Sequence, residues 1–172
     1  MSFFTLTAVI LVGGFEAGGQ IAGVYPFAGL DRFHSSSALV GAGVAYTTGP
    51  LRFELGYRYT SLPGVQSSPY RLSLHQAAFE AGYGFLRRGD WGLEAIVGPG
   101  YARAERICGS GHETGGAANA ALGLGFFQYA GHSRLALGLL HTLFLEKGGT
   151  DKPGISVAQL LTLRAGVAYV FF

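Results

Sequence analysis

The sequence is poor in charged residues, in cysteine and in long apolar runs. Only 13% of its 172 residues are charged, about half the share of an ordinary soluble domain. The single cysteine, Cys108, cannot form an internal disulfide, and no cysteine and histidine cluster suggests a structural metal. No run approaches the roughly 20 apolar residues of a membrane helix, although the mean hydropathy is positive. Such a composition indicates apolar residues at alternating positions.

The alternation is clearest at residues 51–60, LRFELGYRYT, where odd positions are apolar and even positions are polar or small. This period of two is typical of a β-strand with two unlike faces. The pattern recurs in eight segments, at about residues 16–29, 38–48, 51–60, 71–86, 91–105, 117–129, 134–145 and 157–172. The connections alternate between short turns (TTGP, RRGD, YAGHS) and longer polar stretches (DRFHSSS, SLPGVQSSPYR, RAERICGSGHETGG, EKGGTDKPGIS).

Short turns at one end and long loops at the other are typical of transmembrane barrels. We therefore predict one domain, residues 15–172, that is all-β: an eight-stranded antiparallel up-and-down transmembrane β-barrel. The apolar faces would contact lipid, and aromatic residues near both strand ends would form two girdles at the water interfaces. The predicted girdle residues are Tyr25, Tyr46, Tyr57, Tyr59, Tyr83, Trp91, Tyr101, Tyr169 and Phe171. A soluble, lipocalin-like barrel is the alternative, but it leaves the two aromatic girdles unexplained.

The chain at this point resembles the small eight-stranded outer-membrane barrels of the OmpA/OmpX-like family. The resemblance covers about residues 16–172 and rests on strand count, loop asymmetry, girdles and the ending RAGVAYVFF. That aromatic ending is similar to the signal read by the barrel-assembly machinery. The resemblance implies a location in the bacterial outer membrane, with the lipid bilayer and lipopolysaccharide as partners. We expect a monomer without cofactors, whose four external loops could also contact an extracellular protein.

The polar faces predict a charged interior. It would contain Arg52, Glu54, Arg58, Glu80, Glu94, Arg134 and Arg164. An eight-stranded barrel is only wide enough for side chains to fill, and an unpaired buried charge is very unfavourable. We therefore predict a plugged, salt-bridged interior and a structural or surface-interaction role. A narrow channel for a small solute is an alternative.

A lipid hydrolase at the outer rim is a further alternative. Ser73 and His75 share the outward face of one strand, and Glu105 has the same parity on the next. A serine, a histidine and a carboxylate could act as nucleophile, base and orienting group. Lipid A deacylases are outer-membrane barrels of this kind, but their His-x-Ser order is opposite to that in RLSLHQAAF. We therefore predict no enzyme, and we give Cys108, His112 and Glu113 little weight as a metal site.

Residues 1–14, MSFFTLTAVILVGG, have the length of a signal-peptide core but lack a positive first region and a clear cleavage site. We interpret them as the remnant of an export signal, with an extra strand or N-terminal extension as the alternative. The formal charge is +2 and the basic residues form no block, so nucleic acid is not an expected partner.

Overall fold

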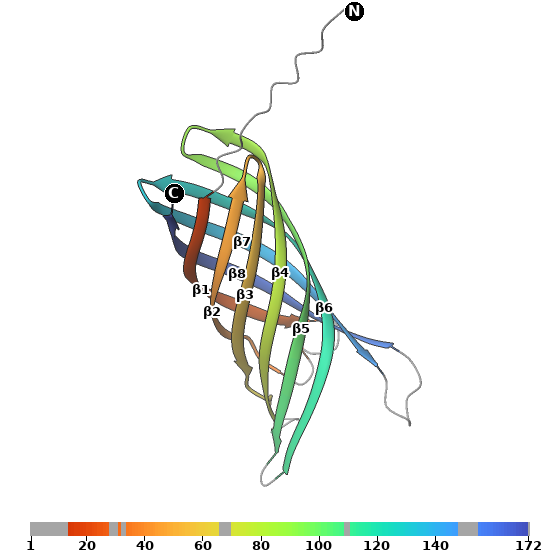
Figure 1. Cartoon of the computed structure of the whole chain (residues 1–172). Helices are drawn as coiled ribbons and strands as arrows, with labels where there is room; N and C mark the ends of the chain where they lie inside the picture. The colour runs from red at the N-terminus through yellow and green to blue at the C-terminus, as the bar shows by residue number, and fades with distance from the viewer. Residues whose placement is uncertain are drawn as a thin grey trace, which may run out of the picture.

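The computed structural model describes residues 14–27, 31, 34–65, 70–108, 111–147 and 155–171. Eight antiparallel strands close into a barrel in chain order, as Figure 1 shows. They are β1 (Gly14–Phe27), β2 (Ser37–Thr48), β3 (Leu51–Leu62), β4 (Arg71–Arg88), β5 (Trp91–Cys108), β6 (Gly111–Ala130), β7 (Ser133–Lys147) and β8 (Ile155–Phe171). The predicted export-signal remnant, residues 1–14, lies outside the described residues except for Gly14, which begins β1. Within the described part of the chain, no helix is long and apolar enough to cross a bilayer.

Three two-residue turns lie at one end of the barrel, which we call the turn end. The first residue of each turn is a glycine with φ of 57° to 59°, a left-handed conformation that glycine adopts without steric penalty: Gly49, Gly89 and Gly131. The second residue of each turn accepts a backbone hydrogen bond from the adjacent hairpin, with donors Gly84, Tyr129 and Val170. These hydrogen bonds therefore link neighbouring hairpins around the turn end of the barrel.

The opposite end, which we call the loop end, differs from the prediction at one connection. Residues 103–116 were expected to form a long loop, but β5 continues to Cys108 and β6 begins at Gly111. The pairing of β6 with β7 starts only at Ala118, opposite Leu145. The β5–β6 hairpin consequently diverges from the β7–β8 hairpin, as Figure 1 shows. A hairpin in water needs no apolar face, so its polar, glycine-rich sequence resembles a loop.

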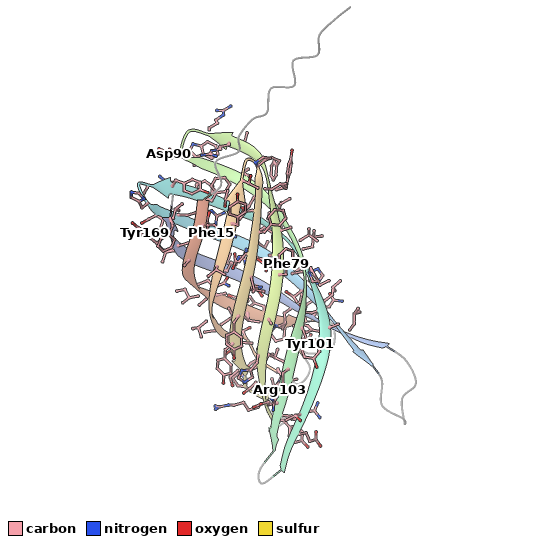
Figure 2. The ribbon with its side chains drawn as sticks, in the orientation of Figure 1. Phe15, Phe79, Asp90, Tyr101, Arg103 and Tyr169 are labelled. Carbon is pink, nitrogen blue, oxygen red and sulfur yellow. The ribbon has the colours of Figure 1, made fainter. Side chains whose placement is uncertain are left out.

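The strand register places the apolar face of every strand on the outside. Ile21, Leu55 and Leu122 are 61–67% exposed. At the C-terminal end, Tyr169 and Phe171 are about half exposed, whereas Val170 is buried. Figure 2 shows Phe15, Phe79, Tyr101 and Tyr169 projecting from the wall. A monomeric soluble protein rarely exposes a continuous apolar surface of this extent, so the wall fits lipid rather than water.

Candidate functional site

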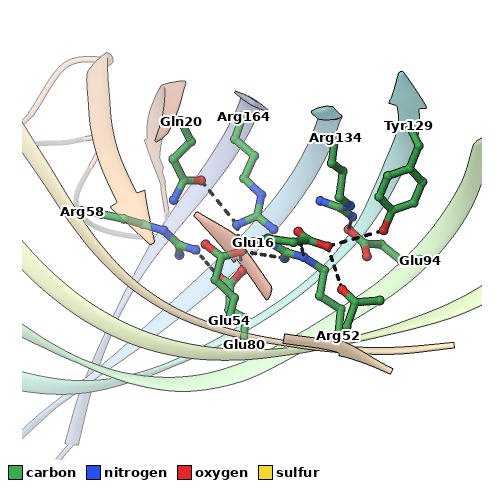
Figure 3. Close-up of polar contacts among 11 residues, drawn as sticks. Glu16, Gln20, Arg52, Glu54, Arg58, Glu80, Glu94, Tyr129, Arg134 and Arg164 are labelled. Atoms are coloured by element: carbon green, nitrogen blue, oxygen red, sulfur yellow. Dashed lines mark hydrogen bonds and ion pairs between the residues drawn. The ribbon is translucent and has the colours of Figure 1, made fainter. Parts of the chain in front are cut away.

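The barrel interior contains a network of ion pairs, drawn in Figure 3. Five ion pairs join four glutamates to four arginines among the described residues: Glu16, Glu54, Glu80 and Glu94 with Arg52, Arg58, Arg134 and Arg164. The two signs balance within this set. Buried charges in so narrow a space are tolerated only when each is paired, and the network meets that requirement.

Nearest the turn end, Arg52 joins two carboxylates. Its Nε donates to Glu16 Oε2 at 3.0 Å, and its Nη1 donates to Glu54 Oε2 at 2.6 Å. The hydroxyls of Thr47 and Tyr129 donate to the other Glu16 oxygen at 2.7 and 3.5 Å. One guanidinium and two hydroxyls thus satisfy both oxygens of a carboxylate that is 2% exposed.

Further along the interior, one carboxylate joins two arginines, whereas at Arg52 one arginine joins two carboxylates. Glu80 accepts hydrogen bonds from Arg58 at 2.5 Å and from Arg164 at 2.8 Å. A separate pair is formed by Arg134 Nη2 and Glu94 Oε1 at 2.7 Å. Glycines provide the space for these side chains, since a Cβ at Gly138 would lie 3.0 Å from Arg164 Nε.

All seven residues assigned to the interior from sequence take part in these ion pairs. The sequence-based set omitted Glu16, which supplies the fourth carboxylate. The signal was present, because Glu16 and Gln20 lie on the face of the first strand opposite to Ile21. Its partner is 36 positions away, so alternation alone could not pair them.

The interior is not polar along its whole length, which corrects the sequence interpretation. Toward the loop end it is filled by a cluster that we call the apolar plug: Ala22, Val24, Leu39, Leu62, Leu74, Ala102, Ala117, Phe144 and Leu160. Val24 and Leu62 are fully buried. The alternation fails there because both faces of the strands are apolar, as in Leu39 and Val40. The alternation of odd and even positions predicts whether a side chain points inward or outward. It does not predict where the interior changes from charged to apolar.

Cavities remain mainly on the turn side of the plug. One of about 50 Å³ is lined by Glu16, Glu54 and Arg164, among others. Another of about 200 Å³ lies beneath the β2–β3 turn. Where Leu39 and Leu140 meet Arg58 and Arg164, the space is only about 10 Å³. That is about the minimum for one water molecule, so the interior is nearly closed at this level.

The predicted catalytic candidates lie on the outer wall near the loop end. Ser73 is opposite Glu105 in the β4–β5 register, and His75 is opposite Arg103. In a triad the carboxylate binds the histidine Nδ1. Here the His75 Nδ1 lies 2.6 Å from the Tyr57 hydroxyl, and the Tyr59 ring is 5.0 Å from the imidazole. This geometry is that of an aromatic cluster, and it gives no support to a hydrolase.

The metal candidates are not brought together by any described contact. The side chains of Cys108 and His112 lie outside the described residues. Glu113 is exposed and lies 3.6 Å from Arg106, on the neighbouring strand. Across the described part of the chain, no three His, Cys, Asp or Glu side chains are grouped as a metal site would require.

The outer wall carries exposed aromatic residues near both ends. The nine predicted girdle residues are 36–57% exposed. Tyr101 lies across Gly116 of the adjacent strand, where any Cβ would overlap its hydroxyl. Beyond Tyr101 on the same face, the Arg103 side chain is 63% exposed and projects from the wall in Figure 2. Arg106 is also exposed, and its guanidinium lies 5.7 Å from the Tyr70 ring centre. Arginines thus adjoin the aromatic rim at the loop end.

A buried histidine joins two of the loop-end connections. His34 forms an isolated bridge with Gly64 and is 5% exposed. Beside it the Ser35 N–H donates to the Pro63 carbonyl at 3.0 Å. Burial lowers the pKa of His34 below its usual 6.5; Arg106 adds to this, while hydrogen bonds to backbone groups of Pro63 and Leu62 oppose it. The imidazole is therefore neutral near pH 7.

No protein-family model matches the chain, and no curated protein matches it. Among solved structures, Neisserial surface protein A (NspA) is 16% identical over 91% of this chain and 97% of its own, with a TM-score of 0.71. OprG of Pseudomonas aeruginosa is 14% identical over 94% and 97%, with a TM-score of 0.61. Ail, the attachment invasion locus protein of Yersinia pestis, is 12% identical over 92% and 97%, with a TM-score of 0.55.

None of these three neighbours is described as an enzyme. At such low identity the likeness shows the fold, and the fold agrees with the apolar wall and the closed strand order. The chain is an eight-stranded antiparallel barrel of the bacterial outer-membrane type, and the predicted fold class and resemblance are confirmed.

Proposed function

We propose that this protein is a sealed outer-membrane barrel whose loop-end rim binds the phosphate groups of lipopolysaccharide. The observation that carries the proposal is a pair of exposed arginines on the outer face next to the aromatic girdle, Arg71 and Arg103; Arg106 is also exposed, on the opposite face of β5. The orientation follows from the general arrangement of such barrels, in which short turns face the periplasm and longer connections face outward. The loop end therefore meets the outer leaflet.

The height of the arginines supports this assignment. Aromatic side chains sit at the membrane–water interface, where Tyr57 and Tyr101 are both about half exposed. Arg103 is two residues beyond Tyr101 on the same face, or roughly 7 Å along the strand. That step carries the guanidinium from the interface to the level of the headgroups. Guanidinium groups bind phosphate oxygens through two parallel hydrogen bonds, so arginine suits this ligand.

The rim arginines are available to a ligand. Arg103 lies 3.4 Å from Glu105 and Arg106 lies 3.6 Å from Glu113, with both arginines more than half exposed. Exposed pairs of this kind contribute little, typically below about 1 kcal/mol, so a polyanion can displace them. A barrel of the same fold offers a parallel: Ail of Yersinia pestis has a crystal structure in complex with sucrose octasulfate, a heparin analogue.

The interior supports a sealed barrel rather than a channel. The apolar plug offers no polar surface to an ion, and the arginines and glutamates beneath it are paired. In planar bilayers we therefore expect no stable conductance from the refolded protein. A reproducible single-channel current would contradict the sealed state while leaving the rim proposal intact.

The rim proposal is tested by comparing two single variants of the full chain. Arg103→Gln removes one exposed charge at the loop end, and Arg88→Gln removes one exposed charge at the turn end. We expect binding of purified lipopolysaccharide, measured by surface plasmon resonance, to weaken at least about tenfold for the first variant and little for the second. Equal affinities of the two variants, or equal binding of dephosphorylated lipopolysaccharide, would refute the proposal. The monomeric state and the loop contact with an extracellular protein stay predictions.

A further inference from the structure

We propose that the barrel has a second site, at the turn end, for a small oxyanion such as a phosphate or a carboxylate group. The site is the cavity of about 200 Å³ beneath the β2–β3 turn, which the Gly49 and Pro50 backbone helps to line. It lies at the opposite end of the molecule from the arginine rim, and it does not depend on lipopolysaccharide binding.

The charges that line this cavity are mostly positive. Three arginines and one carboxylate contribute to its wall: Arg52, Arg87, Arg134 and Glu94. Glu94 is already held by Arg134 at 2.7 Å. Glu16 and Glu54 bind Arg52, but neither lines this cavity. The cavity therefore presents more positive than negative charge to a ligand.

Hydrogen-bond donors remain at the cavity after the ion pairs are counted. Each guanidinium has five N–H donors. Arg134 is 4% exposed, and its Nε is buried without a hydrogen-bond partner. Arg87 makes only a long contact from its Nε, 3.4 Å to the Gly89 carbonyl oxygen, among its described hydrogen bonds. An oxyanion in the cavity would accept hydrogen bonds from the remaining Arg87 N–H groups, whereas the Arg134 Nε has almost no accessible surface and could be reached only after its neighbours move.

Aromatic rings hold two of the three arginines in place. The Arg134 guanidinium lies 5.0 Å from the centre of the Phe127 ring, and that of Arg87 lies 5.6 Å from the Tyr129 ring. Such contacts fix the guanidinium planes and shield one of their faces from water. Preorganised donors lose less conformational freedom when a ligand arrives, which favours binding.

The size and position of the cavity define the ligand class. A volume of about 200 Å³ is well above the roughly 10–15 Å³ that one water molecule requires, so the cavity has space for a small ion. The apolar plug closes the barrel beyond it, so the ligand enters and leaves on the turn side. Under the proposed orientation that side faces the periplasm, where free phosphate and small carboxylates are both available.

The experiment uses the full chain refolded in a phosphate-free non-ionic detergent. Inorganic phosphate is titrated by calorimetry at constant ionic strength, with chloride as the balancing anion. Arg87→Gln is compared with Arg88→Gln, because both residues are exposed at the turn end and lose the same charge, but only Arg87 lines the cavity. We expect the Arg87 variant to bind phosphate about tenfold more weakly and the Arg88 variant to bind like the unaltered chain. A heat-dependent gel shift verifies that both variants fold.

Two results would overturn the proposal. One is the absence of phosphate binding to the unaltered chain. The other is equal weakening by the two variants, which would indicate non-specific attraction to a charged rim. Competition by acetate would assign the site to carboxylates as well as phosphate, and its failure to compete would restrict the site to phosphate.

Discussion

Glu80 is the residue on which two interior arginines depend, since it accepts hydrogen bonds from the buried Arg58 and the partly buried Arg164. In Glu80→Gln the side chain keeps its shape but loses its charge, so neither guanidinium has a compensating carboxylate at this position. We expect the free energy of unfolding to fall by about 3–5 kcal/mol, as when one partner of a buried ion pair is removed. Urea unfolding in lipid vesicles, followed by the fluorescence of the single tryptophan, measures the change.

The matched control is Arg103→Gln, which breaks an ion pair on the exposed wall. Here the expected loss is below about 1 kcal/mol, because exposed pairs are screened by water and salt. Similar losses in the two variants would show that the interior network is solvated and contributes no more than a surface pair.

For single residues, the sequence predicts whether a side chain points inward or outward, but not which side chain it pairs with. The alternation of residues 51–60 assigns Arg52, Glu54 and Arg58 to the inner face, because successive strand residues point to opposite sides. It cannot predict that Glu80 meets Arg164, 84 positions away. That contact depends on the tilt and stagger of the strands in the closed barrel, which no local pattern encodes.

At the scale of elements, the contact between the β1–β2 and β3–β4 connections should depend on pH. The pKa of His34 is lowered by burial, so the folded contact favours the neutral imidazole. When His34 is exposed, the imidazole binds a proton as the pH falls below about 6.5, whereas the buried imidazole resists protonation. The contact is therefore fully stable above that pH and loses stability below it.

Hydrogen exchange of the Ser35 amide, which donates to the Pro63 carbonyl, reports this contact. After correction for intrinsic exchange, we expect its protection to decrease between pH 6.5 and pH 5 in the unaltered chain. In His34→Gln, which does not titrate in this range, protection should not change with pH. A parallel decrease in both proteins would rule out His34 as the cause.

The strand segments that form the barrel wall could be predicted from sequence, whereas the part of the β5–β6 hairpin beyond the wall could not. Eight strands are recognisable because lipid on one side and a narrow interior on the other impose alternation on each. The part of the β5–β6 hairpin beyond the wall, at the loop end, has no lipid on either face. Residues 111–116 therefore show no alternation of apolar and polar residues. Their strand conformation comes from pairing with β5, up to the Cys108–Gly111 pair.

For the whole molecule, the orientation in the membrane is the property to test first. In a Cys108→Ser background, Thr114→Cys places a thiol at an exposed position of the β5–β6 hairpin. Asp90→Cys places one in the exposed β4–β5 turn. A membrane-impermeant maleimide applied to intact cells should label the first variant and leave the second unlabelled until the outer membrane is permeabilised. The reverse pattern would invert the orientation and move the arginine rim to the periplasm.

The division of the interior into a charged half and an apolar half is likewise a property of the whole barrel and not of any one strand. Charged pairs occupy the turn side and the apolar plug occupies the loop side. Composition and alternation predict closure and a filled interior, but the boundary between the two halves emerges only when eight strands contribute side chains at a common height. Leu62 at the end of β3 and Val24 near the end of β1 belong to the same buried cluster, although their strands do not pair with each other.

The divergence of β6 from β7 at Ala118 has a consequence for how the surface can change over time. From Gly111 to Ala117, β6 extends without β7, a reach of roughly 20 Å at 3.3 Å per residue. Under the proposed orientation, an antibody or a phage approaching the cell would meet this tip before the wall. Ala117 belongs to the apolar plug and Gly116 lies under the Tyr101 ring, so only residues 111–115 of the tip can change without disturbing the plug or the wall. This short segment is where antigenic variation can accumulate without loss of the fold.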